Sequence, residues 1–180
     1  HLSIRRQRQM CIRDSPYAAY DPDLLTWVHV AEVSSFLKAH LRYLNPALPG
    51  QEQDRYYSEV ARIAEALGAR HVPHSRQEID DYLEAIRPQL LCDERSREIV
   101  RILFDAPAPS RLAKPFGALM MRAGVDLLPD WASDMLDLSQ SDRQRQLIRM
   151  AVRRTAPVLR WAVRSGSVHR ARRRMGLPIR

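Results

Sequence analysis

The stretch "SPYAAYDPDLLTWVHVAEVSSFLKAHLRYL", residues 15–44, decides the fold class. Asp21 followed by Pro22 is a favourable helix start, because the aspartate side chain can accept hydrogen bonds from free backbone N–H groups and proline suits the first helical turn. No glycine or proline interrupts the residues that follow until the segment "NPALPG". The sequence therefore predicts one long helix from Pro22 to about Leu44.

A projection of this helix at 100° per residue shows which side chains share a face. One face carries Leu25, His29, Val33, Phe36 and His40. The opposite side of the first two turns is apolar as well, and a helix that is apolar on all sides is surrounded by protein. We therefore expect His29 to be buried. From the residues alone, two roles stay open for it: an ordinary core histidine bonded to a backbone carbonyl, or a ligand or catalytic group.

The rest of the chain repeats helical signals. Caps and apolar residues at spacings of three and four predict helices over about 51–68, 75–88, 93–105, 115–128, 130–138 and 142–164. Alternating strand patterns are absent. The sequence predicts an all-α fold, a single bundle-like domain of six to seven helices that is incomplete at its N-terminus.

Composition narrows the class of protein. The chain has 180 residues, of which 45% are hydrophobic and 28% are charged, which is typical of a globular domain. No apolar run approaches the roughly 20 residues that a membrane span needs. Two cysteines, Cys11 and Cys92, form neither a disulfide framework nor a metal quartet. Without a signal peptide, a cytoplasmic location is expected. The near-absence of lysine favours a bacterial source with GC-rich DNA.

Charge is distributed unevenly along the chain. Residues 1–14 carry +3, residues 15–142 carry −7, and residues 143–180 carry 12 arginines and no acid. We divide the chain into a non-native or disordered head (1–14), a helical body (15–140), and a basic amphipathic helix and tail of the same domain (141–180). On that last helix, one stripe holds Arg145, Arg149, Arg153, Arg160 and Arg164, opposite Leu147, Ile148, Ala151, Val158, Leu159 and Ala162.

Three roles fit such a helix: a solvated basic face on a packed helix, a membrane-surface helix, or a binding site for an acidic partner. We expect the apolar side to pack on the domain and the arginines to be solvated. At most weak contact with an anionic membrane surface follows. No aromatic residue interleaves the arginines of "HRARRR", residues 169–174, to stack bases, so no specific nucleic-acid partner is predicted.

Common catalytic motifs are absent. The sequence has no G-x-S-x-G, no P-loop, no H-E-x-x-H and no dinucleotide fingerprint. The pair His71 and His74 in "HVPH" has no carboxylate or cysteine partners and is interpreted as an ordinary loop. No metal site is predicted, and no catalytic residue is assigned.

A resemblance to a known family adds to this. The segments "YAAYDPDLLTWVHV", "DRYYSEVARIAEALGARHVPHSRQEIDDYL" and "LLPDW" together resemble the MpaB and latex-clearing-protein family, which includes the bacterial rubber oxygenases. The resemblance covers about residues 17–131. It implies an all-helical haem b protein that uses O2 on a hydrophobic substrate, isoprenoid-like or otherwise unsaturated, either a small molecule or a polymer.

The resemblance also implies a role for His29. The histidine of the W-V-H motif belongs to a helix near the cofactor, so His29 is expected to bind haem as part of the pocket wall. The proximal ligand of the family lies upstream of this motif, at positions that would fall before Arg5 of this chain. The chain is thus expected to be the C-terminal part of the catalytic domain and inactive alone.

The first residues fit that expectation. "RRQRQMCIRDS" shows no amphipathic period, and "QMCIRDS" resembles a translated sequencing adaptor, so native sequence is expected to resume near Ser15 or Pro16. A genuine basic arm for a nucleic acid or partner is the other interpretation of residues 1–14. For the whole chain, the alternative to an oxygenase is a non-enzymatic, all-α ligand-binding or regulatory module with a basic C-terminal tail.

Overall fold

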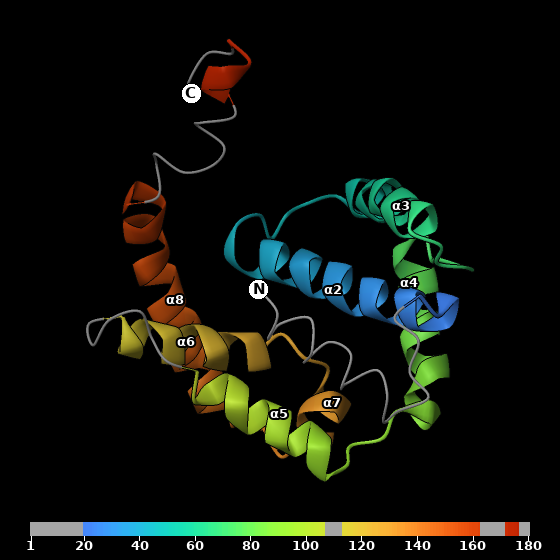
Figure 1. The fold of residues 1–180 in the computed structure, drawn as a ribbon. Helices are drawn as coiled ribbons and strands as arrows, with labels where there is room; N and C mark the ends of the chain where they lie inside the picture. The colour runs from blue at the N-terminus through green and yellow to red at the C-terminus, as the bar shows by residue number, and fades with distance from the viewer. Residues whose placement is uncertain (1–19, 107–112, 163–171, 177–180) are drawn as a thin grey trace, which may run out of the picture. The chain divides into compact units, whose positions relative to one another are not determined.

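A computed structural model describes residues 20–106, 113–162 and 172–176 of the chain. The helices in these residues are α2 (Pro22–Tyr43), α3 (Gly50–Ala66), α4 (Arg76–Ile86), the 3-10 turn η1 (Arg87–Gln89), α5 (Glu94–Phe104), α6 (Lys114–Val125), α7 (Asp130–Met135) and α8 (Asp142–Ala162) (Figure 1). No strand occurs in these ranges, and the all-α prediction is confirmed. The predicted head, residues 1–14, and Arg164 lie outside the described residues.

Local sequence signals set the helix starts. The side chain of Asp21 accepts hydrogen bonds from the backbone N–H groups of Asp23 (2.9 Å) and Leu24 (3.3 Å) at the start of α2. Ser75 caps α4 and Asp93 caps α5 in the same way. These bonds satisfy N–H groups that have no partner inside the helix, which is why the starts could be predicted.

The chain divides into two compact units, His1–Leu90 and Leu91–Arg180, where the sequence predicted one bundle. The division follows Pro88, which lies in η1, and Leu90, whose backbone is extended. Proline disfavours a helix interior, because it lacks the N–H donor and its ring meets the preceding turn, and here the helical turn ends one residue after it, at Gln89. Each unit therefore has its own set of packed helices.

The first unit packs α2, α3 and α4 against one another. Its main core joins Val30, Val33 and Leu37 of α2 to Tyr57 of α3 and Ile79 of α4. A second cluster of small side chains, Ala61, Ala64, Ala69 and Val72, receives Leu25 of α2. Both α2 and α3 contribute to the two clusters, so the contact between these helices forms the centre of this unit.

The second unit is built on the contact between α6 and α8. Ala123 and Val125 from the end of α6, and Ile148 and Val152 from α8, are buried there. Helix α5 has no buried residue, and the three apolar side chains Ile99, Ile102 and Leu103 are exposed. The apolar spacing thus predicted correctly that α5 is a helix. The apolar side chains that share this spacing are exposed, however, so the spacing did not indicate which side chains are buried.

Candidate functional site

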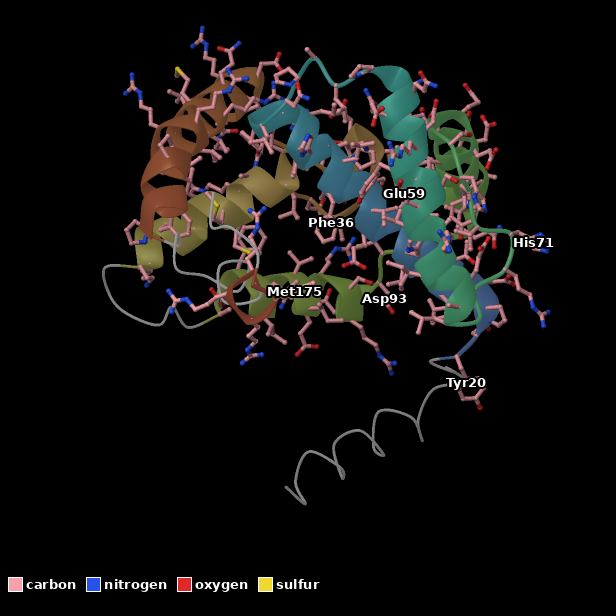
Figure 2. All side chains as sticks on the ribbon, turned by 90° about the horizontal axis from the view of Figure 1, so that it is seen from above. Tyr20, Phe36, Glu59, His71, Asp93 and Met175 are labelled. Atoms are coloured by element: carbon pink, nitrogen blue, oxygen red, sulfur yellow. The ribbon has the colours of Figure 1, made fainter. Side chains whose placement is uncertain are left out.

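The face of α2 that packs into the core differs from the predicted one. The buried residues are Thr26, Val30, Val33, Ser34 and Leu37. This face is turned by about a quarter of a circle from the predicted one, at 100° per residue. His29 is only partly buried, and Phe36, labelled in Figure 2, is 59% exposed. The expectation that His29 is buried on an inward face was therefore wrong.

Two hydroxyl groups explain this rotation. The hydroxyl of Thr26 lies 2.9 Å from the carbonyl oxygen of Pro22 and 2.7 Å from that of Arg70, and it can donate to one of them at a time. The hydroxyl of Ser34 donates to the carbonyl oxygen of Ala31, at 3.2 Å. Polar side chains are buried at little cost when they are hydrogen-bonded. A hydrophobicity pattern counts serine and threonine as solvent-facing. The projection from the sequence therefore assigned the wrong buried face to α2.

His29 lies on the outer flank of α2 beside an acidic residue one turn later. Partial burial lowers the pKa of His29 below its ordinary value of 6.5, and the Glu32 carboxylate opposes this shift by raising it. Burial is the larger effect, so the imidazole is neutral at pH 7. A neutral imidazole offers one N–H donor and one lone pair, which suits hydrogen bonding to a ligand or metal coordination.

Helix α3 contributes a tyrosine to the same flank. Burial and, to a smaller extent, Glu32 raise the pKa of Tyr56 above its ordinary value. Its hydroxyl donates to the backbone carbonyl of Val33 at 3.4 Å, which links α3 to α2. Glu32 therefore acts electrostatically on both His29 and Tyr56, one on each helix. The sequence analysis missed Tyr56 as a member of this group, because the link crosses from one helix to another.

Apolar side chains flank His29 on the outside of the helix. Val28 is 53% exposed and Phe36, two turns further on, is 59% exposed. On the helical projection Phe36 falls within about 20° of His29. This outer face, Val28, His29, Glu32 and Phe36, combines open apolar surface with a neutral imidazole. It is the candidate site of the first unit.

The loop after α3 holds the start of α2 in place. Gly68 has a φ of +101° and ends α3 with two backbone bonds, from Gly68 N–H to Glu65 and from Ala69 N–H to Ala64. This is the Schellman arrangement, which favours glycine. The chain then turns at His71, labelled in Figure 2, with a φ of +53°. The contact between Thr26 and Arg70 joins this loop to the helix that carries His29.

The histidines of this loop do not form a metal site. A ring nitrogen of His74 lies 3.0 Å from a carboxylate oxygen of Glu65, and its backbone N–H donates to Glu78 at 2.7 Å. In the described ranges, no group of three or more histidine, cysteine, aspartate or glutamate side chains could hold a metal ion. His74 does have a carboxylate neighbour, unlike the sequence interpretation, and the bond orders the loop.

In the second unit, residues 126–130, which run from the end of α6 into the "LLPDW" segment, are attached to α8 by two ion pairs. Arg149 donates from two nitrogens to the two carboxylate oxygens of Asp126, at 2.8 Å each, and the Asp126 side chain is fully buried. Arg145 donates to Asp130 at 2.8 Å. The two arginines are four residues apart, and so are the two aspartates. The prediction that Arg145 and Arg149 form a solvated face was wrong, because both arginines form ion pairs and their side chains are only 24% and 35% exposed.

The comparisons with known proteins identify the family. A family model described as "ER-bound oxygenase mpaB/B'/Rubber oxygenase, catalytic domain" matches residues 1–178. The chain belongs to this family. No match to it is found among curated proteins or among solved structures.

Family membership places the candidate site of the first unit inside an oxygenase catalytic domain. The matched range includes the W-V-H segment of α2 and the "LLPDW" segment, which runs into the start of α7. Within the described residues, no helix is long and apolar enough to cross a membrane. The candidate surface for contact with a cofactor is thus the outer face of α2.

Proposed function

We propose that the protein is a haem b-dependent oxygenase that acts with O2 on a hydrophobic, unsaturated substrate, and that His29 lines its haem pocket. One observation carries the proposal: α2 leaves Val28 and Phe36 exposed on the same outer face as His29. Most large apolar side chains of a folded helix face the core, so an open apolar face around an imidazole favours a bound apolar group.

The residues on this face fit one side of a haem. The macrocycle is flat and largely apolar, and Val28 and Phe36 present apolar surface of that character. His29 would contact the group as part of the wall, while the proximal ligand is expected from a segment upstream of the W-V-H motif. When bound, haem supplies the chemistry of O2, and the protein supplies orientation and a dry pocket.

The chain's own residues then have separate tasks. Phe36 and Val28 exclude water from the face of the helix, which favours a hydrophobic substrate. His29 holds a proton on one ring nitrogen, where it can donate a hydrogen bond to a polar atom in the pocket. Glu32 keeps the imidazole from becoming a weaker base, because its charge raises the pKa of His29.

Haem reconstitution of the full-length protein, which includes the upstream segment expected to hold the axial ligand, tests the proposal. The wild type, His29→Ala and His40→Ala are compared, because His40 is a partly buried histidine near the other end of the same helix. We expect His29→Ala to lower haem occupancy while the position of the remaining Soret band stays unchanged, since the axial ligand is kept. His40→Ala should leave occupancy at the wild-type level.

The other outcomes separate the parts of the proposal. A Soret band that disappears in His29→Ala would make His29 the axial ligand and overturn its role as a wall. Equal haem occupancy in all three proteins would remove His29 from the pocket. Failure of the full-length protein to take up haem under any condition would overturn haem dependence and favour a non-enzymatic ligand-binding module, whereas poor uptake by the 180-residue chain alone is expected.

A further inference from the structure

The outward face of α8 carries an alternation of arginine and apolar side chains. Arg143, Leu147, Met150 and Arg154 follow one another at spacings of four, three and four, so they form one stripe of the helix. All four are exposed, Leu147 by 62% and Met150 by 50%. The stripe therefore combines apolar and cationic groups on a surface that nothing in the described part of the chain covers.

This stripe is distinct from the side that holds the unit together. Ile148 and Val152 are buried against α6, and Arg145 and Arg149 pair with the two aspartates. Those contacts account for the inward side of α8. By contrast, Arg143 and Arg154 form no ion pair with any residue that the structure describes. Their charges are available to something outside the unit.

An apolar groove accompanies the stripe. It has a volume of about 420 Å³ and is lined by Leu147, Met150, Ala151, Arg154 and Thr155. The groove is open to the surface, and most of its lining is apolar. A hydrocarbon segment could lie against it with an anionic group beside Arg154, since a long-chain amphiphile has that combination of chemistry.

We propose that this face of α8 lies on the surface of an anionic phospholipid bilayer. The charge of the region fits this occupant, because residues 143–180 hold 12 arginines and no acidic residue. Arginines attract the anionic headgroups, while Leu147 and Met150 enter the boundary of headgroups and acyl chains. A nucleic acid would use the arginines but not the two apolar side chains, and this face has no aromatic side chain between Arg143 and Arg154 to stack a base.

Vesicle co-sedimentation of the whole chain tests the proposal. Vesicles of equimolar phosphatidylserine and phosphatidylcholine are compared with vesicles of phosphatidylcholine alone. Binding is expected to the anionic vesicles at low salt and to weaken at physiological salt, where the Debye length falls to about 8 Å. Arg143→Gln with Arg154→Gln should lower the partition coefficient roughly fivefold for each arginine removed. Leu147→Gln should lower it about tenfold, because the apolar insertion is lost.

Matched variants separate binding through this face from the effect of net charge and from the effect of exposed apolar side chains elsewhere on the protein. Arg62→Gln with Arg70→Gln removes the same charge from exposed positions of the first unit, and Leu67→Gln removes an exposed leucine there. Both should bind like the wild type. Far-UV circular dichroism checks that every variant keeps its helical content.

Three results would overturn the proposal. Equal losses in the two double-arginine variants would show that net charge alone drives binding. Wild-type binding by Leu147→Gln would show that nothing inserts. Tighter binding to a duplex oligonucleotide than to the anionic vesicles, with the same dependence on Arg143 and Arg154, would make this face a nucleic-acid surface.

Discussion

The hydroxyl of Thr26 is a small feature with a large influence on α2. It is 2% exposed and donates to the carbonyl of Pro22 or of Arg70, so the loop after α3 depends on it for one hydrogen bond. We predict that Thr26→Val, which keeps the shape but removes the donor, lowers the free energy of unfolding by about 1–3 kcal/mol. Urea denaturation measures the change.

Thr155→Val is the matched control for this prediction. Among the residues that the structure describes, the hydroxyl of Thr155 bonds to carbonyls of its own helix alone, those of Ala151 and Val152. Its removal should therefore have a smaller effect. Equal losses in the two variants would mean that the bond to the Arg70 carbonyl contributes nothing beyond the loss of any buried threonine hydroxyl.

Glu32 connects the titration of two other groups. Its charge raises the pKa of both His29 and Tyr56. We predict that Glu32→Gln lowers both pKa values, because an attraction to the imidazolium and a repulsion of the tyrosinate are lost together. NMR titration of the histidine ring and ultraviolet titration of the tyrosine detect the shifts. Glu59→Gln removes the same charge from α3 and should leave His29 unchanged.

The lowered pKa of His29 makes the stability of the folded protein depend on pH. Its pKa in the folded protein lies below 6.5, the ordinary value, so folding favours the neutral ring. The stabilising contribution is therefore complete above pH 6.5 and is lost as the pH falls through the folded pKa. Glu32→Gln lowers that pKa further, which moves the end of the sensitive range to lower pH.

At the scale of helices, the ion pair between Arg149 and Asp126 joins α8 to the end of α6. Both carboxylate oxygens of a fully buried side chain are bonded to one guanidinium. We predict that Arg149→Ala lowers the free energy of unfolding by about 3–5 kcal/mol, because Asp126 is left as a buried charge. Chemical denaturation followed by circular dichroism measures this loss.

The control is an arginine whose ion pair is exposed. Arg97 donates to Asp137, a carboxylate that is 77% exposed, at 3.4 Å. Arg97→Ala should change the stability little, since exposed pairs contribute weakly. If Asp126→Ala combined with Arg149→Ala is as unstable as Arg149→Ala alone, the cost does not come from the unpaired carboxylate and our explanation fails.

The helices show which structural features depend only on residues that are close together in the sequence. Asp21, Ser75 and Asp93 identify helix starts because each cap acts on N–H groups within three residues. The direction in which a helix faces is not local. For α2 it depends on the Arg70 carbonyl, and for α8 on Asp126 and Asp130, all distant in sequence. The helix positions could thus be predicted, but the buried faces and ion pairs could not.

For the whole molecule, the position of the core is the feature that the apolar pattern did not reveal. Ile79 of α4 and Ile99 of α5 both follow an N-cap in an amphipathic helix, yet Ile79 is 2% exposed and Ile99 is 59% exposed. We predict that Ile79→Ala lowers the free energy of unfolding by about 2–5 kcal/mol and that Ile99→Ala changes it by less than about 0.5 kcal/mol. Urea unfolding compares them, and similar losses in both would show that α5 has a buried face.

Part of the candidate site could be predicted from the sequence. His29 was singled out because it interrupts an apolar helix, and the family resemblance was confirmed by the match to the oxygenase catalytic domain. Its role at haem stays a prediction. The contributions of Tyr56 and Glu32 could not be predicted, because they arise only where α2 and α3 lie side by side.

The matching four-residue spacing of Asp126 and Asp130 and of the arginines on α8 permits more than one alignment. A shift of α8 by four residues, about 6 Å, would bring Arg149 to Asp130 and Arg153 to Asp126, so ionic pairing alone accepts both positions. The same shift would replace Ile148 and Val152 in the core by Val152 and Ala156, which are smaller. Side-chain volume, and not charge, therefore selects the observed alignment. The two aspartates bind α8 but do not determine which of the two alignments the helix adopts.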